Sequence, residues 1–189
     1  MILLMKRSPR KSKASSLSLT RVTRSIYFLI GFYILSIAMF DSGNLITREA
    51  VIDRSTLAFV LLVLNTAAWY VASDKKIKSK NLPVYVLTLG LLAFAGFSTY
   101  WERGMASPST ILYALPLLSV ATLKNRHALI ATAALAIGIY AFSAIKYFND
   151  FFNEGFRIQL WGQIALYSGV ILTMTWLIMI IADLRHDSR

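Results

Sequence analysis

The chain has 189 residues, of which 57% are hydrophobic and only 15% are charged, and its formal net charge is +11. Soluble domains are close to a quarter charged, so this composition is shifted toward that of proteins in contact with lipid. The complete absence of cysteine excludes disulfides, thiol catalysis and thiolate metal sites.

A polar and basic segment begins the chain. Residues 1–24 carry seven Lys and Arg residues together with several serines. Such a segment has too little apolar surface to offset the entropy lost on ordering. We therefore expect residues 1–24 to form a disordered cytoplasmic arm.

Six apolar segments follow the arm, separated by short stretches that hold most of the charges. Their lengths are close to what is needed to cross about 30 Å of hydrocarbon. The segments are residues 25–41, 55–73, 82–101, 107–123, 127–148 and 156–182. Pro116 in the fourth segment predicts a kink. The predicted fold is therefore all-α: residues 25–182 form one membrane bundle of six transmembrane helices, paired as three antiparallel hairpins, and residues 183–189 form a cytoplasmic tail.

The distribution of basic residues predicts the orientation of these helices. Lys and Arg are enriched in the cytoplasmic segments of membrane proteins. With the N-terminus inside, 15 of the 20 basic residues fall on the cytoplasmic side and five on the outer side. The sequence thus predicts a multi-pass protein of a plasma membrane, of bacterial type, with both termini in the cytoplasm. This placement attributes the positive charge to topology and anionic lipid rather than to nucleic acid.

Small residues recur every three or four positions in three of the segments, as they do where membrane helices approach closely. The sixth segment has Gly162, Ala165 and Gly169 on one face. The fifth has Gly138 in line with three alanines, and the second has Asn65 in line with three alanines. We expect these three faces to meet in the bundle interior, and a ligand cavity lined by the same faces is the alternative.

Four polar residues within or at the ends of the segments are candidate ligand-binding residues: Asp41, Asn65, Glu102 and Lys146. Asn65 lies well inside the second segment, where an unpaired amide is costly, so it either forms an interhelical hydrogen bond or contacts a ligand. Asp41 continues a row of residues on one face of the first segment, and we expect this face to point into the bundle. Lys146 either extends toward the headgroups or pairs with Asp41 or Glu102 in an outward-facing vestibule.

Motifs of known enzyme chemistry are missing from the sequence. His127 and His186 have no second histidine or carboxylate at metal-ligand spacing. The chain also lacks a phosphate-binding glycine loop, HExxH and GxSxG. We therefore expect no catalytic residues, no bound metal and no cofactor, and a function other than catalysis.

The exit of the sixth segment, Trp176–Arg189, reads WLIMIIADLRHDSR. In this exit and in its series of spans with short loops, the chain resembles the membrane-embedded sensory regions of bacterial histidine kinases and diguanylate cyclases. The resemblance implies a sensing or partner-binding module coupled to a cytoplasmic or membrane protein through its last helix. In those proteins the exit leads into a further domain, whereas this sequence stops there.

Two other classes share the predicted layout. The substrate-binding membrane subunits of energy-coupling-factor transporters look similar in length and number of spans, and they dock through helix faces rich in small residues. An accessory subunit that only packs against a larger membrane complex is the third possibility. A transport subunit should hold a small molecule, whereas a sensor or accessory protein should be found with another polypeptide.

Overall fold

A computed structural model of the chain describes residues 18–73, 81–102, 104, 107–151 and 157–187, and the side chains as far as Ile181. The helices are α1 (Leu19–Ser42), α2 (Arg48–Ser73), α3 (Asn81–Trp101), η2 (Pro108–Tyr113), α4 (Ala114–Ala121), α5 (Arg126–Phe151) and α6 (Arg157–Asp187). The described residues form no strand, which confirms the all-α fold.

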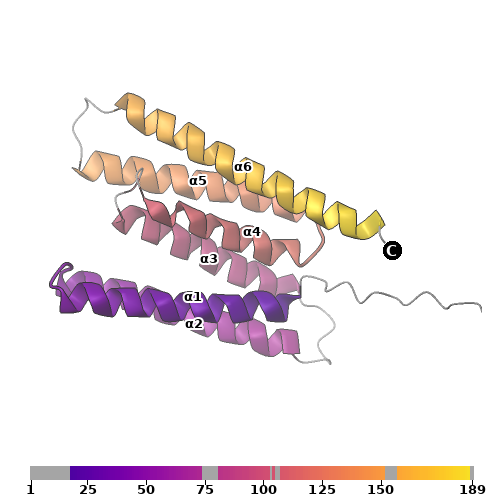
Figure 1. The fold of residues 1–189 in the computed structure, drawn as a ribbon, viewed down its shortest axis with the longest axis horizontal. Helices are drawn as coiled ribbons and strands as arrows, with labels where there is room; N and C mark the ends of the chain where they lie inside the picture. The colour runs from indigo at the N-terminus through magenta and orange to yellow at the C-terminus, as the bar shows by residue number, and fades with distance from the viewer. Residues whose placement is uncertain (1–17, 74–80, 103, 105–106, 152–156, 188–189) are drawn as a thin grey trace, which may run out of the picture.

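The helices run side by side with alternating direction, as Figure 1 shows. α1, α3 and α5 end where α2, η2 and α6 begin, and we call this the Ser42 end of the bundle. The opposite end, at which α1 starts, is the Leu19 end. Consecutive helices pack together as α1 with α2, α3 with η2 and α4, and α5 with α6. The three predicted hairpins are therefore present.

Five helices are long and apolar enough to cross a membrane: α1, α2, α3, α5 and the part of α6 up to Ile181. The fourth predicted segment forms η2 and α4, which together are shorter than the other five. The helix type changes from 3₁₀ to α just before Pro116. Proline has no N–H to donate to the carbonyl four residues earlier, which favours a tighter turn at this point.

The N-terminal boundary of the bundle lies earlier than the sequence predicted. α1 begins at Leu19, so the last part of the predicted arm belongs to a helix, while residues 1–17 lie outside the described part. Leu19, Val22 and Ile26 are buried at helical spacing, whereas Arg21 and Arg24 are exposed. The prediction was wrong here because the basic side chains obscured an apolar helix face.

α3 is the central helix of the bundle. It packs against α2, η2, α4 and α5, and 56% of the residues in its apolar stretch are buried. The corresponding share is 11% for α6, which packs only against α4 and α5 among the pairs with substantial contact. α3 is thus enclosed by other helices, whereas α6 lies at the edge of the bundle with most of its surface uncovered.

The close approaches between helices occur at glycines of α3. A Cβ atom added to Gly90 would lie 2.5 Å from a methyl carbon of Leu64 in α2. A Cβ atom added to Gly96 would lie 2.6 Å from a methyl carbon of Ile139 in α5. Since real Cβ contacts are longer than this, hydrogen is the only side chain that fits at either position without movement of a neighbour. The backbone of α3 therefore approaches α2 and α5 through these two glycines.

Two of the three small-residue faces predicted to lie inside the bundle are exposed. A Cβ atom added to Gly138, Gly162 or Gly169 would meet no atom within 4 Å, and Ala165 is exposed as well. The residue pattern was misleading on α5, because α5 has small residues on both sides. The opposite side, with Ala133, Ala136, Ser143 and Ala144, is the one that is buried.

On α6 the side that packs against the bundle instead carries larger residues. Leu160, Ile171 and Thr175 are its buried residues within the described side chains. The prediction for α2 is confirmed, because Ala58, Asn65 and Ala68 are buried in the bundle.

Candidate functional site at the Ser42 end

The four candidate ligand-binding residues do not form a single site. Glu102 and Lys146 lie near the Ser42 end, the first directly after α3 and the second on α5. Asn65 lies toward the Leu19 end of α2 and is completely buried. Asp41 is exposed at the end of α1, so the inference that it points into the bundle was wrong. The same face of α1 carries Gly31, at which an added Cβ atom would meet no atom within 4 Å, and Ile34, which is exposed.

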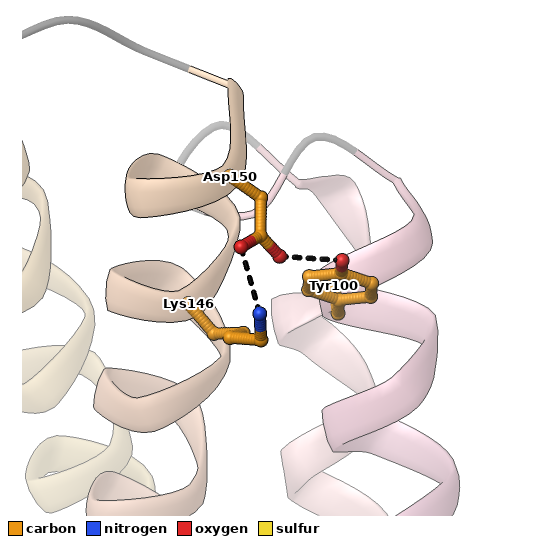
Figure 2. A network of polar contacts seen from close by, with 3 residues as sticks. All are labelled: Tyr100, Lys146 and Asp150. Atoms are coloured by element: carbon orange, nitrogen blue, oxygen red, sulfur yellow. Dashed lines mark hydrogen bonds and ion pairs between the residues drawn. The ribbon is translucent and has the colours of Figure 1, made fainter.

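Lys146 pairs with a residue of its own helix. Its Nζ atom lies 2.7 Å from Oδ1 of Asp150, one helical turn further along α5. Tyr100 of α3 donates a 2.7 Å hydrogen bond to the other carboxylate oxygen of Asp150 (Figure 2). The Lys146 side chain is 55% exposed. Asp150 thus joins α3 to α5, and the structure gives Lys146 no contact with Asp41 or Glu102.

The turn after α3 is held by packing and by short-range hydrogen bonds. Gly104 has φ +57°, a conformation that favours glycine. A Cβ atom added there would lie 2.5 Å from the Cβ atom of Tyr147. The Ser107 N–H donates to the Gly104 carbonyl at 3.2 Å, and the Ser107 hydroxyl accepts from the Ser109 N–H at 3.0 Å. These contacts fix the start of η2 against α5.

Glu102 is positioned by this turn. The Ser109 hydroxyl donates to the Glu102 carboxylate, and the Glu102 N–H donates to the Ser98 carbonyl at 3.0 Å. Both Ser107 and Ser109 are buried, and Glu102 is half-buried. The carboxylate therefore lies at the Ser42 end with its bonded serine in the interior of the bundle.

Polar side chains continue from Glu102 into the interior. Ser98 and Thr99, on the next turn of α3, are both buried. The Ser98 hydroxyl lies beside the Tyr33 hydroxyl of α1, and Arg54 of α2 is close enough to Tyr33 to act on it electrostatically. Residues of α1 and α3 thus meet at Ser98. The Thr99 hydroxyl donates to the carbonyl of Ala95 in its own helix.

Two tyrosines complete the buried polar region. Tyr113 of η2 and Tyr140 of α5 are each 0% exposed, and their rings contact edge to face with centroids 6.0 Å apart. The Tyr113 hydroxyl lies beside those of Thr99 and Ser143. Tyr140 also contacts the ring of Tyr167 in α6, at 5.4 Å. We refer to Thr99, Tyr113, Tyr140 and Ser143 as the hydroxyl cluster.

The hydroxyl cluster was not predicted, because the candidate ligand-binding residues were limited to charged and amide side chains. A usable signal was present, since Tyr140 falls near the middle of its apolar segment rather than at an end. The pairing of Lys146 with Asp150 could also have been predicted from the sequence, because residues four positions apart lie on one face of a helix.

Asn65 connects α2 to α1. Its Nδ2 atom donates a 2.9 Å hydrogen bond to the Thr23 carbonyl, which confirms the predicted interhelical bond. On the same pair of helices, the Tyr27 hydroxyl donates to the Thr66 hydroxyl at 2.9 Å. The Asn65 side chain is thus explained by helix packing, apart from its Oδ1 atom, for which the described residues provide no partner.

The chemistry available at the Ser42 end is hydrogen bonding by hydroxyls and by the Glu102 and Asp150 carboxylates, together with the ion pair of Asp150 with Lys146. Within the described part of the chain, no three His, Asp or Glu side chains are grouped so that they could hold a metal ion. Comparison with known proteins adds no relative: no family model, no curated protein and no solved structure matches this chain.

Proposed function

We propose that this chain is a multi-pass membrane protein that binds another membrane polypeptide through α6 and catalyses no reaction itself. The observation that carries the proposal is the exposed face of α6 formed by Gly162, Ala165 and Gly169. Glycine inside a helix is unfavourable by roughly 1 kcal/mol relative to alanine. A Cβ atom added to either glycine would meet no atom of the described part of the bundle within 4 Å, so packing within this part does not account for the two glycines.

A transmembrane helix of a partner fits this face by its chemistry. Lipid tails are as apolar as leucine, so helices associate in a membrane by close packing, which small residues permit. α6 has 31 residues and is thus about 46 Å long, which exceeds the hydrocarbon thickness of about 30 Å. The extra length supports a sensing role in which α6 transmits the bound state of its face to the cytoplasmic side.

A photo-crosslinking experiment tests the binding of a partner. Benzoylphenylalanine in place of Leu166, an exposed residue next to the glycine face of α6, should give an adduct with one discrete polypeptide in native membranes. The matched control is the same amino acid in place of Phe59, an exposed residue of α2, which should react with lipid only. Adding Gly169→Leu should abolish the Leu166 adduct, because its side chain would fill the space needed by the partner helix.

Two outcomes would contradict the proposal. Lipid adducts alone at the Leu166 position would show that the face of α6 meets the bilayer and not a protein. An adduct between two copies of this chain would show that α6 mediates self-association, which is a different function from binding a second polypeptide.

The proposed topology places the Ser42 end outside the cell and the Leu19 end in the cytoplasm. Single cysteines in this cysteine-free chain report it directly. Ser42→Cys, at an exposed position, should react with a membrane-impermeant thiol reagent in intact cells. Ser73→Cys and His127→Cys, exposed at the opposite end, should react only after permeabilisation. Reaction of either of the last two in intact cells would contradict the topology.

A small-molecule-binding subunit of a transporter is the second candidate function. It is favoured by the buried hydroxyl cluster, since a few inward polar groups in an apolar interior are typical of ligand sites. Retention of a small molecule on purification in mild detergent, identified by mass spectrometry and lost in Tyr113→Phe, would support this function over the first.

A further inference from the structure

Within the described part of the chain, the hydroxyls of the two buried tyrosines have no hydrogen-bond partner that meets the usual geometric criteria. For both Tyr113 and Tyr140, and for Ser98, no described residue offers the oxygen atom a hydrogen bond of ordinary geometry. Each of these side chains is at most 1% exposed. Buried hydroxyls without partners are rare in native proteins, and several in one region would remove a substantial fraction of the net stability of a domain.

Three buried threonine hydroxyls of the bundle are satisfied locally, unlike the Ser119 hydroxyl, which also has no partner among the described residues. Those of Thr88, Thr132 and Thr175 each donate to the carbonyl four residues earlier in the same helix, at 2.7–2.8 Å. A tyrosine hydroxyl lies too far from its own backbone for this bond. The Tyr113 and Tyr140 hydroxyls therefore need a hydrogen-bond partner outside their own helical turn, either a group of another residue or a bound molecule.

Two other hydroxyls lie close to the Tyr113 hydroxyl. The hydroxyls of Thr99 and Ser143 lie beside it. A Cβ atom added to Gly96 would be 3.9 Å from the Tyr113 oxygen, 3.4 Å from the Ser143 oxygen and 2.6 Å from Ile139. The region is thus polar and crowded. A buried water needs two to four polar partners and little more than its own volume, whereas a larger molecule needs more room.

We infer that the hydroxyl cluster is an internal water-binding site, in which a water molecule joins the hydroxyls of Tyr113, Thr99 and Ser143. Glu102, which directly follows α3, and its bonded Ser109 lie between this site and the Ser42 end of the bundle. The inference does not depend on the proposed partner-binding function, which concerns the exposed glycine face of α6.

The change Tyr113→Phe tests the site through the sign of its effect on stability. If a water is bound, removing the hydroxyl leaves the water short of one partner, and Tm should fall by about 2–4 °C. If the hydroxyl is unpaired, phenylalanine is the better residue there, and Tm should stay the same or rise. Tyr70→Phe, at a position that is 66% exposed, is the matched control and should leave Tm unchanged.

A second measurement separates bound water from a direct bond between Tyr113 and its neighbouring hydroxyls. The full chain with ¹³C in its tyrosine rings and alanine methyls is placed in liposomes and studied by water-edited solid-state NMR. The Tyr113 signal, identified by its loss in Tyr113→Phe, should receive polarisation from water about as fast as that of Tyr70. A build-up as slow as that of the Ala136 methyl, which is 0% exposed, would overturn the inference whatever the Tm result.

Discussion

Gly96→Leu should prevent stable assembly of the bundle, whereas Gly169→Leu should leave the stability of the isolated chain almost unchanged. At Gly96 even a Cβ atom would overlap Ile139, and the position is enclosed by α5 and η2. Overpacking by a few methylene groups already costs about 1–3 kcal/mol, and leucine adds four carbons here. At Gly169 the same side chain would enter open space.

The measurement is thermal unfolding of both purified variants in the same mild detergent, together with their elution in size-exclusion chromatography. Gly96→Ala provides an intermediate step, in which Ile139 must shift its methyl group by a rotamer change. A graded loss from alanine to leucine at residue 96 is expected. Equal Tm values for Gly96→Leu and Gly169→Leu would show that α3 and α5 are not packed as described.

Among the glycines that the structure describes, Gly104 is the one at which a change to alanine should be most damaging. A residue with a side chain in the left-handed region costs about 1–2 kcal/mol more than glycine. The added methyl would also lie 2.5–2.6 Å from three atoms of the Tyr147 side chain, including its Cβ atom, which cannot move without the backbone of α5. Movement of Tyr147 would relieve the overlap but not the cost of the left-handed conformation, so we expect a loss of several degrees in Tm.

Gly43→Ala is the matched control for this change. Gly43 also follows the end of a helix at the Ser42 end, but its φ is −84° and an added Cβ atom would make ordinary contacts of 3.4 Å or more. Alanine should be tolerated there with little change in Tm. A comparable loss in both variants would mean that any side chain is unfavourable at this end of the bundle, independently of φ.

Hydropathy was sufficient to predict where the helices lie, because long apolar runs bounded by charges can satisfy their backbone only as helices in lipid. The bond from Asn65 was predictable for a related reason, since a buried amide must find a partner. The inward faces of α5 and α6 were not predictable. Ala133 and Gly138 lie on opposite sides of one helix, and composition alone does not distinguish which of them faces the bundle.

The candidate site was predicted least well, because its residues come from turns and helices whose relative placement is a property of the whole bundle. Glu102 was found from its position at the end of an apolar run, but Ser109, which binds it, gave no signal. Tyr113 and Tyr140 are 27 positions apart and meet only because η2 packs against α5. The role of Gly104 depends on Tyr147 in the same way.

The difference between the first and last helices has a consequence for biogenesis. α1 and α2 are joined by hydrogen bonds from Asn65 and from Tyr27, so under the proposed membrane topology this hairpin can form as soon as both helices are in the bilayer. α3 and α5 can pack together only after α5 is made, and α6 then docks with few buried residues. Assembly should therefore proceed from the N-terminus, with α6 as the last helix to join and the first to be released to a quality-control protease.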